Sequence, residues 1–123
     1  MSDGLILFAH GARDPEWAAP VRRVQTAIRQ RAPGLRVELA FLEFMAPDLA
    51  ACGAELVAVG CRDIAILPMF IAQGGHLKRE VPELVAALAA AHPAARFTLR
   101  PPVGEAEAVI AAMADHALAQ VAD

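Results

Sequence analysis

Short apolar runs alternate four times along the chain with segments whose apolar residues recur at helical spacing. The runs predict β-strands over residues 4–9, 35–42, 63–68 and 96–100. The segments after them predict helices over about residues 15–32, 47–59, 79–92 and 105–121. Four strand–helix units in succession are typical of an α/β protein with a parallel sheet and helices on both faces. We expect a single domain of this class over residues 1–123.

Capping residues mark most of the expected helix ends. Asp14 is placed to cap the first helix, and Asp48 to cap the second, which Gly60 then ends. The third helix is expected to begin near Arg79, with Pro82 in its first turn, where a missing N–H costs little. These signals mark where the helices are expected to begin and end.

Three of the helices carry an apolar stripe that we expect to face the sheet. The stripe residues are Trp17, Val21, Val24 and Ile28 in the first helix, Val81, Leu84, Val85 and Leu88 in the third, and Ile110, Met113, Ala117 and Val121 in the last. Gly53 is a weak point inside the second helix, because glycine disfavours helix interiors.

The chemistry of the strands predicts their order. The first strand (LILFA) and the third (IAILP) are apolar without interruption, whereas the second (RVELAF) and the fourth (RFTLR) carry charged residues. Uninterrupted apolar strands belong at the centre of a parallel sheet that is covered on both faces. We therefore expect the order 2-1-3-4, which opens a crevice between the carboxyl ends of the first and third strands.

Two histidines follow the two central strands. His10 comes directly after the first strand, and His76 follows a loop in which Gly74 and Gly75 would let the backbone turn back over the crevice. Two neutral imidazoles suit divalent cobalt, nickel, iron, copper or zinc. Two ligands do not close a structural site, so a metal held here would keep open positions and exchange. The alternatives are a strand-end histidine bonded to backbone for His10 and a loop histidine or helix cap for His76.

Composition excludes several classes of partner. The chain is 57% hydrophobic and has a formal net charge of −3, which argues against binding nucleic acid or an anionic membrane surface. No apolar run approaches the ~18 residues of a membrane-spanning helix, and no secretory pattern precedes the first strand. Cys52 and Cys61 form neither a CxxC pair nor a disulfide framework, so we expect buried free thiols and a cytoplasmic protein.

Three motifs together resemble one family. HGARDP after the first strand, FLEFMAPDL after the second and PMFIAQGGHLKREVP after the third are similar to the short, CbiX-type sirohydrochlorin chelatases. The resemblance implies a flavodoxin-like (chelatase-like) fold and insertion of a divalent metal into sirohydrochlorin, in cobalamin or siroheme biosynthesis. Co²⁺ is the expected metal, with Fe²⁺ or Ni²⁺ as alternatives, and it would be a substrate rather than a bound cofactor. His10 and His76 stand at the family's metal-binding positions.

Two departures from the family pattern leave both histidines in place. Ala12 stands where the family often has serine, so it lacks the hydroxyl with which a serine could bind the substrate, and Glu80 stands where the family often has aspartate. The resemblance to one half of the two-domain chelatases further implies a homodimer.

Other residues near the crevice acquire candidate roles under this interpretation. Glu43, at the end of the second strand, is the candidate base for the pyrrole protons; the alternative is an ordinary solvent-exposed carboxylate. Arg13, Lys78 and Arg79 are candidates for binding the substrate carboxylates, since cations at a helix start call for an anionic partner. Phe70 is expected either to line an apolar wall against the macrocycle or to belong to the core.

Two further interpretations stay open. A noncatalytic metal carrier would use the same two histidines and differ only in lacking turnover. An anion- or phosphate-binding domain is suggested by GGHLKR before a helix, although that segment lacks the spacing of a phosphate loop. His92 and His116 lie in helical sequence away from the crevice, and we expect them to be surface residues.

Overall fold

A computed structural model describes residues 1–122, and Asp123, the last residue of the expected domain, lies outside the described residues. Four parallel strands form one sheet in the order β2-β1-β3-β4, as expected from their chemistry. The strands are β1 (Gly4–Ala9), β2 (Arg36–Phe41), β3 (Asp63–Pro68) and β4 (Arg96–Leu99).

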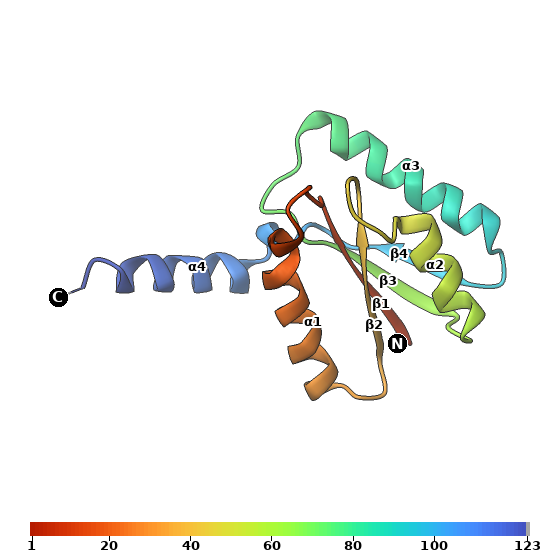
Figure 1. Ribbon diagram of the computed structural model, residues 1–123, viewed down its shortest axis with the longest axis horizontal. Coiled ribbons are helices and arrows are strands. Elements are labelled where there is room, and N and C mark those ends of the chain that lie inside the picture. Colours follow the sequence, from red (N-terminus) through yellow and green to blue (C-terminus); the bar gives the residue numbers. More distant parts are fainter. Residues whose placement is uncertain (123) are drawn as a thin grey trace.

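The helices lie on both sides of this sheet (Figure 1). They are η1 (Pro15–Ala18), α1 (Ala19–Arg31), α2 (Leu49–Ala58), α3 (Gly75–Ala91), η2 (Val103–Glu105) and α4 (Glu107–Ala119). Helix α1 lies on one side, α2 and α3 lie on the other, and α4 projects away from the body of the molecule. We call the side of α2 and α3 the covered face and the side of α1 the open face.

Alternate residues of the central strands belong to two separate cores. On the covered face, Ile6, Ile64 and Ile66 are fully buried against α2 and α3. On the open face, Leu7 and Val37 are buried together with Ala18 and Val21 of the α1 side. This alternation is the consequence of the two-residue period of a strand.

The expected caps form where the sequence places them. The Asp14 carboxylate accepts a hydrogen bond from the Glu16 N–H at 2.9 Å, and the Asp48 carboxylate accepts one from the Ala51 N–H at 2.8 Å. Gly60 follows α2 with a φ of 103°, a left-handed conformation that suits glycine. Cys52 and Cys61 are buried free thiols, as expected.

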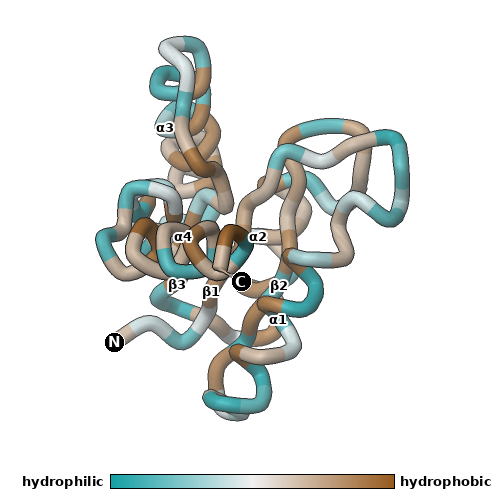
Figure 2. The backbone as a smooth tube through the Cα atoms, turned by 90° about the vertical axis from the view of Figure 1, so that its left-hand side faces the viewer, coloured by the Kyte–Doolittle hydropathy of each residue, from teal (hydrophilic) through white to brown (hydrophobic). Residues whose placement is uncertain are grey.

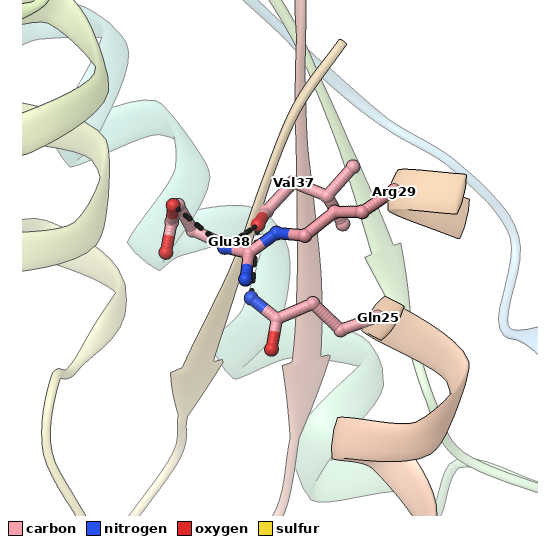
Figure 3. Close-up of polar contacts among 4 residues, drawn as sticks. All are labelled: Gln25, Arg29, Val37 and Glu38. Atoms are coloured by element: carbon pink, nitrogen blue, oxygen red, sulfur yellow. Dashed lines mark hydrogen bonds and ion pairs between the residues drawn. The ribbon is translucent and has the colours of Figure 1, made fainter. Parts of the chain in front are cut away.

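Polar side chains of α1 occupy the outer edge of β2 (Figure 3). Gln25 and Arg29 each donate a hydrogen bond of 2.9 Å to the Val37 carbonyl, and Arg29 also pairs with Glu38 at 3.1 Å. An edge strand otherwise offers such a carbonyl to another strand. These contacts also show that the flank of α1 with Gln25 and Arg29 faces the β2 edge.

Two helices differ from the sequence expectation in where they begin or what they contact. Helix α3 begins at Gly75, before Arg79, so Pro82 lies in its interior and not in its first turn. Helix α4 was expected to turn Ile110 and Met113 inward, but both are exposed, and the helix contains no buried residue. Trp17 and Val24 of the first apolar stripe are exposed as well. An apolar stripe indicates which side of a helix prefers contact, and it does not specify the contact.

None of the helices within residues 1–122 is both long enough and apolar enough to cross a membrane.

Candidate functional site

The carboxyl ends of β1 and β3 lie side by side at the centre of the sheet. The chain leaves β1 toward α1 on the open face and leaves β3 toward α3 on the covered face. Connections that depart in opposite directions from neighbouring parallel strands create the usual ligand-binding position of an open α/β sheet. His10 follows β1 directly, and His76 lies at the start of α3, after the loop that follows β3.

His10 is the residue after β1, and its ring packs on Phe70, with the ring centroids 4.3 Å apart. Phe70 is itself only 2% exposed and contacts Phe8 of the covered core. The imidazole is half-buried. An aromatic ring fixed in the core therefore supports the His10 ring from one side and limits its rotation.

Gly11 lets the chain turn sharply beside His10. Its φ is +87°, and a Cβ at this position would lie 2.0 Å from the Glu43 carbonyl oxygen. The Glu43 N–H donates a hydrogen bond of 3.0 Å to the His10 carbonyl. Only glycine meets both the conformation and the spacing here. This close contact places Glu43, the candidate base, next to His10 along the edge of the sheet, with its side chain exposed.

His76 lies in the first turn of α3, whose amino-terminal end stands over the carboxyl edge of the sheet in Figure 1. The expected glycine hinge is wrong: Gly74 is an extended N-cap residue with φ −73°, and neither Gly74 nor Gly75 has a positive φ. The His76 Nε2 lies 2.7 Å from the Glu80 carboxylate one turn later. His76 is therefore held by a helix and not by a flexible loop.

Glu80 is a residue whose role the sequence reasoning missed. A carboxylate that binds one ring nitrogen of a histidine fixes the orientation of the ring and sets the proton on the ring. The signal was present as the four-residue spacing of His76 and Glu80, which become neighbours only if the helix begins before His76.

The buried position of Phe70 rules out the first of its two expected roles. A side chain that is 2% exposed presents no wall to a macrocycle, and it belongs to the core beneath His10. The apolar surface beside it is supplied by Ile71, which is 73% exposed. A strand-end run such as PMFIA does not reveal which of its residues points inward, because the chain leaves the strand geometry there.

The three candidate cations are exposed. Arg13 lies over the ring of Phe44, with its guanidinium carbon 4.8 Å from the ring centroid, so a residue after β1 contacts one after β2. Lys78 and Arg79 are in the first turns of α3, and no side chain caps this helix start. Free N–H groups and the helix dipole favour an anion at such a position.

The other titratable groups do not extend the site. Within residues 1–122, no group of three or more histidine, cysteine, aspartate or glutamate side chains is placed to hold a metal ion. Burial raises the pKa of the Cys52 thiol to about 12, helped by the charges of Glu38 and Glu55. Burial also raises the pKa of Cys61. Because thiolates are the metal-binding form, neither cysteine is a suitable ligand.

The remaining two histidines lie away from this edge. His92 is the residue that ends α3, where it is half-buried and packs near Phe97 with a centroid distance of 6.3 Å. His116 is exposed on α4. The expectation of surface residues is confirmed for His116 and only in part for His92.

Comparison with known proteins gives consistent relatives. The chain is 31% identical over 83 residues to the sirohydrochlorin cobaltochelatase of Methanococcus aeolicus, covering 68% of this chain and 58% of that protein. It is 37% identical over 82 residues to the protein of the same name from Saccharolobus islandicus, covering 67% and 62%. The matched segment thus spans about three fifths of the length of these relatives.

Solved structures show the same fold. A CbiX protein from Marinobacter aquaeolei superimposes with a TM-score of 0.85 at 24% identity, covering 96% of both chains. The sirohydrochlorin chelatase SirB of Bacillus subtilis, solved in complex with cobalt, superimposes with a TM-score of 0.82 at 24% identity, covering 99% of this chain and 52% of SirB.

The family assignment rests on a match that covers the whole sheet and its helices. The family model described as CbiX matches residues 4–119, from the first residue of β1 to the last residue of α4. The sheet order, the switch point and the two flanking histidine loops all lie within that match. The chain belongs to the CbiX family.

Proposed function

We propose that this protein inserts a divalent metal ion into sirohydrochlorin, with His10 and His76 as the ligands of the incoming metal. The observation that carries the proposal is the position of His10 at the switch point, supported by Phe70 and at the same edge of the sheet as the first turn of α3. Membership of the CbiX family and relatives named sirohydrochlorin cobaltochelatase support the choice of substrate.

The chemistry requires a metal that is held weakly enough to be released. Two imidazoles leave open positions on the ion, and the pyrrole nitrogens of the macrocycle can enter there. Glu80 would hold the Nε2 of His76 and leave Nδ1 as the nitrogen that binds the metal. Cobalt is the proposed metal, because SirB has been solved with cobalt and the relatives are named for it. A second SirB structure with Fe³⁺ makes iron the first alternative.

Metal insertion also releases two pyrrole protons, and Glu43 is the proposed acceptor. Its backbone is fixed against His10, and its exposed carboxylate is free to reach a macrocycle above the edge. We expect Glu43→Gln to slow insertion with little loss of cobalt affinity. Equal losses of rate and affinity would make Glu43 a metal ligand instead.

The cations are proposed to orient the macrocycle through its carboxylates. Arg13 follows His10 in the loop after β1 and lies over Phe44, and Lys78 and Arg79 are in the first turns of α3, close to His76 in the sequence. Substitution of Arg13 or Arg79 by glutamine should raise the KM for sirohydrochlorin more than it changes kcat, because these groups contact the rim of the substrate.

The test is spectroscopic conversion of sirohydrochlorin by purified protein supplied with Co²⁺. His10→Ala and His76→Ala should each reduce insertion at least a hundredfold while the thermal transition stays within a few degrees of the parent. His92→Ala is the matched control, because His92 caps the far end of the helix whose first turn contains His76. Insertion at the parent rate by either site variant would reject the ligand pair.

The same assay separates a chelatase from a noncatalytic carrier. A carrier would bind cobalt through both histidines, but it would yield no more than one equivalent of cobalt-sirohydrochlorin per protein molecule. The homodimer expected from the sequence also remains a proposal, because the described residues belong to one chain.

A further inference from the structure

Phe44 is an exposed aromatic residue with an unusual backbone, in the loop that follows β2. It is 58% exposed, and within residues 1–122 it is the one residue other than glycine with a positive φ, 66°. The Met45 N–H donates a hydrogen bond of 2.8 Å to the Glu43 carbonyl, which closes a tight turn centred on Phe44. Such a turn is strained for a residue with a Cβ, and glycine would adopt it more easily. Burial does not explain a phenylalanine at this position, so its ring calls for another explanation.

The Phe44 ring contacts the side chain of Arg13. The guanidinium carbon of Arg13 lies 4.8 Å from the ring centroid, which is within the ~6 Å range of a cation–π interaction. The planar guanidinium carries several N–H donors, and the ring offers them no strong acceptor. The contact therefore restricts the position of Arg13 and leaves its donors available for an anion.

Arg29 shows the more common use of an arginine in this chain. Its guanidinium donates to the Val37 carbonyl at 2.9 Å and pairs with Glu38 at 3.1 Å, so its charge is compensated within the protein. Within residues 1–122, no ion pair involves Arg13. The charge of Arg13 therefore has no carboxylate partner in the part of the chain that the structure describes.

The contact between Arg13 and Phe44 lies at the same edge of the sheet as the histidine site. The Glu43 N–H donates to the His10 carbonyl at 3.0 Å, and Phe44 is the next residue. Figure 2 shows β2 and β3 on either side of β1, so Arg13 is turned toward the side of β2. The other candidate cations belong to α3, which follows β3. A macrocycle at His10 would thus have candidate cations on both of its sides.

We propose that Phe44 is a positioning residue, which holds the Arg13 guanidinium at the edge of the site for a carboxylate of the macrocycle. This inference rests on the proposed function, because sirohydrochlorin is the anion that Arg13 would bind. A mobile arginine loses side-chain freedom when it binds an anion, and a ring that restricts the arginine beforehand reduces this loss. The strained backbone of Phe44 places the ring where it can make the contact.

A double-mutant cycle on sirohydrochlorin binding tests this role. The metal-free protein is titrated with sirohydrochlorin, and the absorbance of the tetrapyrrole reports the dissociation constant. Arg13→Gln should raise the constant about tenfold and Phe44→Leu about threefold. The double variant should bind no more weakly than Arg13→Gln alone, because Phe44 acts through Arg13. Phe44→Tyr, which keeps an aromatic face, should bind like the parent.

A direct contact between the Phe44 ring and the macrocycle predicts different results. In that case Phe44→Leu would weaken binding equally in the parent and in the Arg13→Gln background, and the effect would persist in about 1 M NaCl. A role through the Arg13 charge predicts that the effect of Phe44→Leu disappears at this salt concentration. Additive losses, or a loss that salt does not reduce, would overturn the proposal. Tighter binding by Phe44→Leu would overturn it too, because the ring would then hold Arg13 away from the substrate.

Stability measurements separate positioning from a structural role of Phe44. Phe44→Gly removes the strain of the positive φ, so the midpoint of thermal unfolding should stay unchanged or rise by about 2–4 °C. Sirohydrochlorin binding should nevertheless weaken as much as in Phe44→Leu. A lower midpoint in Phe44→Gly would show that the ring supports the fold, and it would contradict the proposal.

Two controls distinguish failure of this inference from failure of the proposed function. Cobalt affinity of Phe44→Leu should stay within about twofold of the parent, whereas a larger change would show that the substitution disturbs His10 and would overturn the assigned role. A parent protein that does not bind sirohydrochlorin would overturn both the proposed function and the role of Phe44. Binding by the parent without coupling between Arg13 and Phe44 would overturn only the role of Phe44.

Discussion

The covered face and the open face of the sheet differ in how completely their own chain covers them. On the covered face, α2 and α3 leave Ile6, Ile64 and Ile66 with no accessible surface. On the open face, α1 covers β2 and β1, but Leu5, Ala65 and Leu67 stay half-exposed. The comparison indicates that one half of the hydrophobic core is complete within a single chain. The other half is left partly exposed by the single chain.

The largest expected effect on stability comes from substituting Ile66 and Leu67, neighbouring residues of β3 whose side chains face opposite sides of the sheet. Ile66→Ala should lower the free energy of unfolding by about 3–5 kcal/mol, because it leaves a cavity in the complete core. Leu67→Ala removes a side chain of the same size from the open face, and in dilute protein it should cost only about 1–2 kcal/mol. Urea unfolding of both variants at low concentration measures the difference.

Protein concentration sharpens this first comparison. If a second copy of the chain covers Leu67 in the proposed homodimer, the cost of Leu67→Ala should grow as the concentration rises, while that of Ile66→Ala stays constant. Equal losses for the two variants at every concentration would show that the faces do not differ.

The next effect concerns the close approach of α2 and α3 on the covered face. A Cβ on Gly53 would lie 2.6 Å from Leu88 Cδ1 and 3.1 Å from its Cγ, and Leu88 is only 3% exposed. Gly53→Ala should therefore lower the free energy of unfolding by about 1–2 kcal/mol, although alanine favours a helix by about 1 kcal/mol. Thermal unfolding tests this.

Gly34→Ala serves as the comparison for Gly53→Ala. Nothing lies within 4 Å of a Cβ at Gly34, so this substitution should be neutral or stabilising by about 0.5 kcal/mol. A stabilised Gly53→Ala variant would mean that α2 and α3 can separate, and that the covered face is less tightly packed than its burial indicates.

Thiol reactivity distinguishes the two faces in a third way. Burial raises the pKa of Cys52 to about 12, so at pH 8 almost no reactive thiolate is present in the folded protein. A thiol reagent should therefore label Cys52 only as fast as the protein unfolds. A cysteine introduced by Ala65→Cys on the open face should react much faster, because this face is only partly covered in the single chain. Rapid labelling of Cys52 under native conditions would contradict the difference between the faces.

The smallest expected effect on stability concerns Asp3, which lies just before β1 at the amino-terminal edge of the sheet. The Asp3 carboxylate accepts hydrogen bonds from the Arg62 and Asp63 N–H groups, and these bonds lower the pKa of Asp3 below its ordinary value of 3.8. Their contribution to stability is present above the unfolded pKa of 3.8 and is lost as pH falls through the lower folded pKa. Asp3→Asn should thus be slightly less stable than the parent at pH 5–8, and the difference should shrink below about pH 3.8. A constant difference down to pH 2 would exclude Asp3 as its source.

The sequence by itself determined the sheet, because strand order depends on local composition. Uninterrupted apolar runs specify strands covered on both faces, and charged residues specify edge strands, so the order 2-1-3-4 followed without any contact being known. It also placed His10 beside β1 and Glu43 beside β2, because parallel strands bring their carboxyl ends to one edge. The caps at Asp14 and Asp48 formed because a cap depends on residues within one turn.

Only the tertiary structure decided what each apolar surface contacts. Phe70 lies in the core beneath His10 and Ile71 lies outside, because the path of the chain after β3 turns one inward and the other outward. His76 lies one helical turn before Glu80 and contacts it because α3 begins at Gly75. From the sequence, Gly74 and Gly75 predicted a loop at this point, so the earlier start of the helix was missed. The stripe of α4 was recognised, but its direction was wrong, because hydrophobic periodicity records the side of a helix that avoids water and not the surface, within the chain or in a partner, that covers it.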